Sequence, residues 1–165
     1  MPIETKVEGK PEQITSLADW LTSSLEPAVS ASGDRFSSAR TTLGSEWQGE
    51  TAEAIVSWLA DAAGASDSLS NRVTDIATAL TTYASILFSV KTEAECVRSD
   101  ATAGGLAVSG TVVQEPKDTA DTKKAALYSS LSVRMSTANS KLATGQQDLR
   151  DRKSTRLNSS HLELS

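Results

Sequence analysis

The sequence predicts an all-α protein: a long antiparallel helical hairpin with a Trp-x-Gly turn, and a third helix that packs on the far end of the second. Two observations lead to this prediction. After residue 50, apolar residues recur in alternating steps of four and three, the pattern of one long helix with an apolar seam. Before it, Ser45–Glu50 separates this run from an earlier helical one. The seam comprises Ile55, Leu59, Ala62, Leu69, Val73, Ile76, Leu80, Tyr83, Leu87, Val90, Ala94, Val97 and Ala101.

The first helix is expected to begin at Pro11, because a proline at the first helical position loses no hydrogen bond. Pro27 is expected to kink it, and Ser32-Gly33-Asp34 is a second weak point, where the helix could break outright. Gly44 is predicted to end the helix as a left-handed cap. Its apolar face comprises Ile14, Leu17, Ala18, Leu21, Leu25, Ala28, Phe36, Ala39 and Leu43.

The second helix is expected to run from Glu50 to about Thr102 and to stop at Gly104-Gly105. At a rise of 1.5 Å per residue, its roughly fifty residues reach about 75–80 Å, whereas the first helix reaches about 50 Å. The first helix therefore covers the second only to around Tyr83. The remaining seam, Leu87 to Ala101, needs another partner.

That partner is expected to be a third helix over residues 118–150, with Asp118 and Asp121 at its start. Arg134 and Gly145 fall near its seam positions and weaken the pattern. The predicted segments are a disordered or extended N-terminus (1–10), the hairpin (11–105), an extended β-like connector (106–117) and the third helix (118–150). The apolar face of the third helix comprises Ala120, Leu127, Leu131, Ala138, Leu142 and Leu149.

The last fifteen residues, 151–165, are expected not to belong to the natural protein. Residues 151–161 resemble the translation, in one reading frame, of a common short-read sequencing adapter. The alternative is an ordinary polar tail. If the adapter interpretation holds, His161, the single histidine, drops out, and the natural chain is expected to continue past Arg150.

Composition narrows the function classes. Aromatic residues make up only 4%, which suits a thin seam between helices better than a thick core. The net charge of -5 and the lack of a basic stripe argue against a nucleic-acid partner. The sequence contains no run of eighteen apolar residues, so it predicts no transmembrane segment. The polar N-terminus does not predict a cleaved signal peptide.

The sequence predicts no catalytic, cofactor-binding or metal-ligating residues. Without His161, no histidine is available as a base for Cys96 or for any serine. The acidic residues are scattered along faces expected to be exposed, and Gly104-Gly105 stops a helix without forming a phosphate-binding loop. Cys96 is interpreted as a thiol on the flank of a helix, with no chemical role.

The three tryptophans are given different roles. Trp20 and Trp58 are expected to pack at or beside the seam between the first two helices. Trp47, with Gly49 two residues later, lies in the turn and has two interpretations of equal weight. Either it plugs the open end of the hairpin, or it is the centre of a docking surface.

Trp47-Gln48-Gly49 between two long helices, followed by Ala52 and Ile55, resembles the Trp-x-Gly (WXG) superfamily of type VII secretion substrates. The resemblance covers roughly residues 12–150 and is most detailed from 44 to 105. It implies the helical N-terminal domain of an actinobacterial effector, followed in the full protein by a variable C-terminal toxin or enzyme. It further implies a protein partner or the secretion machinery, a homo- or heterodimer, and a cytoplasmic protein that is exported without a signal peptide to the cell surface or the medium.

One feature departs from that family. Many members carry Tyr-x-x-x-Asp/Glu after the second helix as an export signal, but here Tyr83 is followed at that spacing by Leu87, and Tyr128 by Ser132. The signal is then expected on a partner. The leading hypothesis is a non-enzymatic secretion and interaction domain; the alternative is a self-contained structural coiled-coil protein unrelated to secretion.

Overall fold

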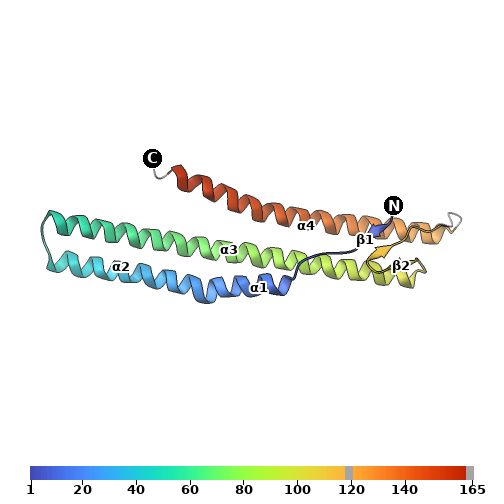
Figure 1. Ribbon diagram of the computed structural model, residues 1–165, viewed down its shortest axis with the longest axis horizontal. Helices are drawn as coiled ribbons and strands as arrows, with labels where there is room; N and C mark the ends of the chain where they lie inside the picture. Colours follow the sequence, from blue (N-terminus) through green and yellow to red (C-terminus); the bar gives the residue numbers. More distant parts are fainter. Residues whose placement is uncertain (118–120, 163–165) are drawn as a thin grey trace. The chain divides into compact units, whose positions relative to one another are not determined.

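The computed structural model describes residues 1–117 and 121–162, and the side chains of residues 1–117 and 121–151. The predictions for Asp118, Ala120 and His161, and the side chains of the expected tail beyond residue 151, lie outside this range. Helices make up most of the described chain, as predicted (Figure 1). The helices are α1 (Pro11–Trp20), the π-helix η1 (Leu21–Leu25), α2 (Glu26–Glu46), α3 (Glu50–Ala103) and α4 (Thr122–Leu162); the strands are β1 (Ile3–Glu4), β2 (Val108–Ser109) and β3 (Val112–Val113).

The predicted disturbance at Pro27 takes the form of a π-helix one turn earlier. The backbone N–H of Glu26 donates to the carbonyl of Leu21, one residue further back than in an α-helix. Pro27 follows directly, in the first turn of α2. Since its ring crowds the carbonyl four residues before it, a widened turn at this point lets the chain remain helical from α1 through α2.

Two predictions about glycines in the first helix are wrong. The chain does not break at Ser32-Gly33-Asp34, because Gly33 is buried inside α2 and an added β-carbon would lie 3.1 Å from that of Ser66. Gly44 does not cap the helix, because α2 continues to Glu46. The residue with a positive φ is Gly49, at 115°, after the extended Trp47.

The predicted stop of the long helix at Gly104-Gly105 is confirmed. Gly105 has a φ of 72°, and its N–H donates to the carbonyl of Thr102 at 3.1 Å. The N–H of Leu106 donates to the carbonyl of Ala101 at 2.9 Å. These two bonds define a Schellman motif, in which a left-handed glycine satisfies the last carbonyls of a helix.

The connector and the N-terminus form a small sheet that the sequence did not predict. β2 and β3 form a hairpin through Gly110 (φ 61°) and Thr111, so residues 106–117 are not simply an extended connector. β1 pairs antiparallel with β3, with Ile3 opposite Val113, and the strand order is β1-β3-β2. The expectation of a disordered N-terminus is corrected for these residues, because pairing with a distant strand orders them.

The chain divides into two compact units: unit 1 comprises residues 1–12 and 82–165, and unit 2 comprises residues 13–81. In unit 1, α4 packs along α3 where the seam needed a partner. Arg134 bonds to Glu93 at 2.7 Å and to Asp100 at 2.6 Å, and Gly145 lies against Ile86. The hydrophobic core of unit 1 comprises Ile3, Ala94, Val97, Ala101, Leu106, Val113, Leu131 and Met135.

In unit 2, α2 and the first part of α3 are antiparallel: Ser70 donates to Glu26 at 2.6 Å, and Phe36 meets Trp58 edge to face with ring centroids 6.2 Å apart. Small side chains make up most of the buried line of α3. Of the predicted seam residues, Leu69 and Ile76 remain half exposed, which corrects the seam in this unit. The buried positions on α3 are Ala52, Leu59, Ala63, Val73 and Ala77.

Candidate functional site

The link between α2 and α3 is only three residues long and contains both predicted site residues, Trp47 and Gly49. The N–H of Trp47 donates to the carbonyl of Leu43 at 3.0 Å, which continues the hydrogen bonding of α2 into the link. The carbonyl of Gly49 accepts the N–H of Glu53 at 3.0 Å, the first bond of α3. The backbone thus fixes the position of Trp47 from both sides.

Gly49 is required by its conformation and not by crowding. Its φ of 115° is one that residues with a β-carbon rarely adopt, yet no atom lies within 4 Å of where that carbon would be. Glu50 and Glu53 in the first turn of α3 place negative charge at the positive end of the helix dipole. The sequence of the link therefore makes a sharp reversal followed at once by a stable helix start.

Trp47 is 44% exposed. A side chain that only plugged the open end of the hairpin would be more completely covered by its neighbours. Trp47 is instead nearly half exposed, in a link whose two ends are hydrogen-bonded to α2 and α3. This geometry fits the docking interpretation better than the plug.

Trp20 and Trp58 were predicted to pack at or beside the seam. Trp58 lies beside it, because its ring meets Phe36 of α2 edge to face, but it is 62% exposed. Trp20 is 52% exposed. All three tryptophans therefore lie at the surface of unit 2.

Trp58 shares one stripe of α3 with Leu69 and Ile76, which are also half exposed. Steps of eleven and seven residues bring these three side chains to within about 20° of one another around the helix. We call these three residues the α3 stripe. Viewed along the axis of α3, the stripe is rotated by about 90° from the buried residues Leu59 and Ala77.

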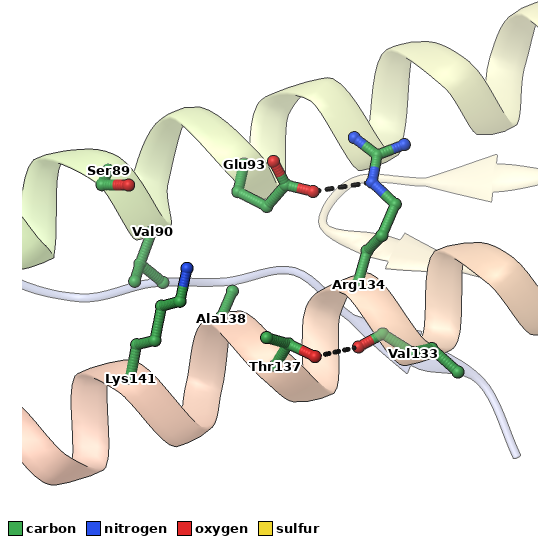
Figure 2. Close-up of a pocket in the computed structure, with 8 residues that line it drawn as sticks. All are labelled: Ser89, Val90, Glu93, Val133, Arg134, Thr137, Ala138 and Lys141. Atoms are coloured by element: carbon green, nitrogen blue, oxygen red, sulfur yellow. Dashed lines mark hydrogen bonds and ion pairs between the residues drawn. The ribbon is translucent and has the colours of Figure 1, made fainter.

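A shallow pocket lies between α3 and α4 in unit 1 (Figure 2). Its charged residues are Glu93, Arg134 and Lys141. Figure 2 shows Arg134 and Glu93 pointing toward each other across it. Hydrogen bonds that Arg134 donates to Glu93 and, with a smaller effect, to Asp100 raise the pKa of Arg134 further above its usual range, so the guanidinium stays charged. The Arg134–Glu93 pair across the pocket is a structural contact between the two helices.

Metal-ligating and thiol side chains can be located in the part of the chain that the structure describes. In this part of the chain, no group of three or more His, Cys, Asp or Glu residues lies close enough to hold a metal ion. Cys96 is a free, exposed thiol on the flank of α3, where the sequence placed it.

The two tyrosines of the incomplete export motif are parts of the packing of unit 1. The amide of Gln146 donates to the hydroxyl of Tyr83 at 3.3 Å. The hydroxyl of Tyr128 donates to the carbonyl of Met1. Burial, and secondarily the charge of Glu115, raises the pKa of Tyr128 above its ordinary value.

The contacts that hold the N-terminal segment were not predicted from the sequence. Thr5 is 1% exposed, and the guanidinium of Arg98 donates to its hydroxyl at 3.0 Å. The alternation of Ile3, Thr5 and Val7 with charged residues was a signal for a strand with one buried face. It was too short to be distinguished from an unstructured tail.

No family model, curated protein or solved structure matches this chain. One helix, α3, is long and apolar enough to cross a membrane by length and composition alone, with a mean hydropathy of 1.3 over its best window. Core helices of proteins without membrane spans pass the same test. The expectation that the chain has no transmembrane segment therefore stays a prediction.

Proposed function

We propose that this chain is a non-enzymatic, helical secretion-targeting and protein-interaction domain of a type VII secretion substrate. In this proposal residues 11–105 form a Trp-x-Gly hairpin, and the C-terminal effector region follows the third helix in the full protein. The observation that supports it is the 44% exposure of Trp47 in a link of three residues between two long helices.

The physical argument concerns what a turn needs. A three-residue reversal requires a residue with positive φ, which Gly49 supplies, and is otherwise satisfied by small polar residues. A half-exposed indole at that point adds little to the turn itself. Large aromatic side chains are, however, the residues that most often anchor protein interfaces. Trp47 is therefore the residue that we expect a partner or the secretion machinery to bind.

The proposed partner is another protein, and the complex is a homo- or heterodimer through the hairpin. The α3 stripe of Trp58, Leu69 and Ile76 supplies the apolar surface that such an association would cover. The proposed location is cytoplasmic before export and extracellular or cell-surface after it. Since neither Tyr83 nor Tyr128 has an acidic residue four positions later, the export signal is proposed to come from the partner.

The alternative is a self-contained coiled-coil protein with no role in secretion. The α3 stripe favours it independently of Trp47, because apolar residues at heptad spacing are the surface that a coiled coil buries. Under this alternative the stripe still binds a helix, but Trp47 has no part in export.

The experiment compares Trp47→Ala with Trp20→Ala, a tryptophan outside the α3 stripe, in an actinobacterial host that carries a type VII system. Both changes remove a half-exposed tryptophan from unit 2, but only the first is in the link. Secreted and cytoplasmic amounts are measured for each variant, with melting temperature as the control for folding. Loss of export for Trp47→Ala alone supports the proposal; normal export of a folded Trp47→Ala protein contradicts it.

A further inference from the structure

The N-terminal segment, residues 1–8, is held in unit 1 by a slot made of three elements. On one side it pairs with β3, which is the central strand of the sheet. Arg98 of α3 reaches it from a second side, donating to the carbonyl and the hydroxyl of Thr5 at 3.3 and 3.0 Å. Tyr128 of α4 closes the third side through its bond to Met1.

The slot distinguishes the side chains of the segment by position. Ile3 and Thr5 are buried, and Val7 packs against the apolar core, whereas Glu4, Lys6 and Glu8 are exposed. Of these side chains, Thr5 makes the most specific contacts with the slot. Its hydroxyl donates to the carbonyl of Thr111 at 2.6 Å and accepts from Arg98, so neither valine nor alanine can replace it without leaving Arg98 with fewer acceptors.

The segment is also attached in a way that lets it leave as a unit. β1 is an edge strand with only two residues in the ladder. Residues 1–8 are followed by Gly9 and then by the exposed Lys10. The φ of 104° at Gly9 and its close approach to Leu87 mark a sharp change of chain direction. Removing the segment would free one edge of β3, an acceptor for another strand.

We propose that this slot is a strand-binding site that reads an extended peptide of the pattern apolar-x-Thr-x-apolar, and that the chain's own N-terminal segment fills it as a displaceable occupant. Recognition combines the free edge of β3 with the two inward apolar positions and the Thr5 site at Arg98. This proposal does not rest on the proposed secretion function, because it uses residues of unit 1 alone.

The test keeps the full chain and cuts it after folding. A protease recognition sequence is inserted between the exposed Lys10 and Pro11, and the folded protein is cleaved there. A fluorescent synthetic peptide with the sequence of residues 1–10 is then added in excess. We expect the label to co-elute with the protein at saturating one-to-one stoichiometry, and the original segment to be released. A cleaved, helical protein that takes up no label would overturn the proposal.

Two further peptides distinguish sequence-specific binding to the slot from non-specific binding. A peptide with Thr5→Val should bind about ten-fold more weakly or worse, because it loses the two hydrogen bonds that the Thr5 hydroxyl makes with Arg98 and with the carbonyl of Thr111. A peptide with Lys6→Gln and Glu8→Gln loses only an exposed ion pair and should bind like the parent. Equal affinity for all three peptides would contradict the proposed selectivity.

A second variant decides the question if the cleaved protein does not keep its helices. In the uncut chain, Ile3→Asp puts a charge at the buried position of β1 and should displace the segment without removing it. This variant is expected to bind the labelled peptide and to regain amide protection at Val113, whose N–H faces β1, when it does, whereas the unaltered chain takes up much less label. Failure of a helical Ile3→Asp protein to bind the peptide would likewise overturn the proposal.

Discussion

The backbone of Gly33 on α2 lies directly against Ser66 on α3, so that an added β-carbon would lie 3.1 Å from the β-carbon of Ser66. This contact explains why a glycine occurs inside a helix, where it is usually unfavourable. It also explains why α2 does not break there. The helices of unit 2 meet through small residues, and the separation between them depends on positions such as this one.

Gly33→Leu is therefore expected to destabilise the protein by about 1–3 kcal/mol, the usual cost of overpacking a close contact. The matched control is Gly64→Leu, since no atom lies within 4 Å of a β-carbon added at Gly64. That change should be neutral or stabilising by up to about 1 kcal/mol, because leucine has the higher helix propensity. Urea denaturation measures both; equal effects would mean that the Gly33 contact does not limit the packing.

Leu87 and Leu69 were both predicted in one seam, but the structure separates them. Leu87 is 1% exposed in unit 1, whereas Leu69 is 50% exposed in unit 2. Leu87→Ala should cost about 2–5 kcal/mol, the range for buried leucines. Leu69→Ala should cost well under half as much. Similar losses in denaturation midpoint would mean that Leu69 is buried in solution, for example by a partner chain.

These two leucines illustrate what a sequence pattern determines. The heptad spacing of residues 55–101 identified a long helix and its end at Gly104-Gly105, because apolar period and glycine chemistry are local properties. The heptad spacing did not reveal which face of α3 is buried, a face that lies about 90° around the helix from the α3 stripe. Which face is buried depends on how closely neighbouring backbones approach at small buried residues such as Ala63 and Ala77, and this is a property of both helices together.

The glycines and the sheet show the same limit. Gly44 was predicted to be the left-handed cap, but the hydrogen bond from Trp47 to Leu43 carries α2 past it, and the positive φ falls at Gly49. The pairing of Ile3 with Val113 joins residues far apart in the chain, for which two-residue strands leave almost no signal. The interruption between the helices at residues 47–49 could be predicted from the sequence, whereas the choice between a covered and an exposed Trp47, and the Thr5–Arg98 contact, could not.

Arg134 bridges two carboxylates on α3, so its loss should leave both without their cation. Because these groups are partly exposed, Arg134→Gln is expected to cost only about 1 kcal/mol, and the difference should shrink in high salt. Lys141→Gln removes the same charge from α4 and is the control. Melting curves at low and high salt distinguish them. A salt-independent loss for Arg134→Gln would indicate packing of its aliphatic stem instead of charge pairing.

Tyr128 should make the protein sensitive to alkali. Its pKa in the folded protein is raised by burial, so above the unfolded value of about 10 the folded state binds more protons than the unfolded state. The contribution of Tyr128 is thus complete below that pH and is lost as the pH rises through the folded pKa. Tyr128→Phe should flatten this part of the stability curve, and Tyr83→Phe serves as the comparison. An unchanged alkaline slope in Tyr128→Phe would rule out Tyr128 as its source.

Trp47→Ala separates the two interpretations of the turn by stability alone. A tryptophan that plugged the hairpin would cost about 3–5 kcal/mol on removal, as buried large aromatics do. Because Trp47 is 44% exposed and the turn is set by Gly49, we expect a loss of at most about 1–2 kcal/mol. Gly49→Ala should cost a comparable amount through its positive φ while keeping the indole. Urea denaturation gives both values. A Trp47→Ala loss in the range of Leu87→Ala would show that the indole is a core residue, and the docking surface would then have to lie elsewhere on unit 2.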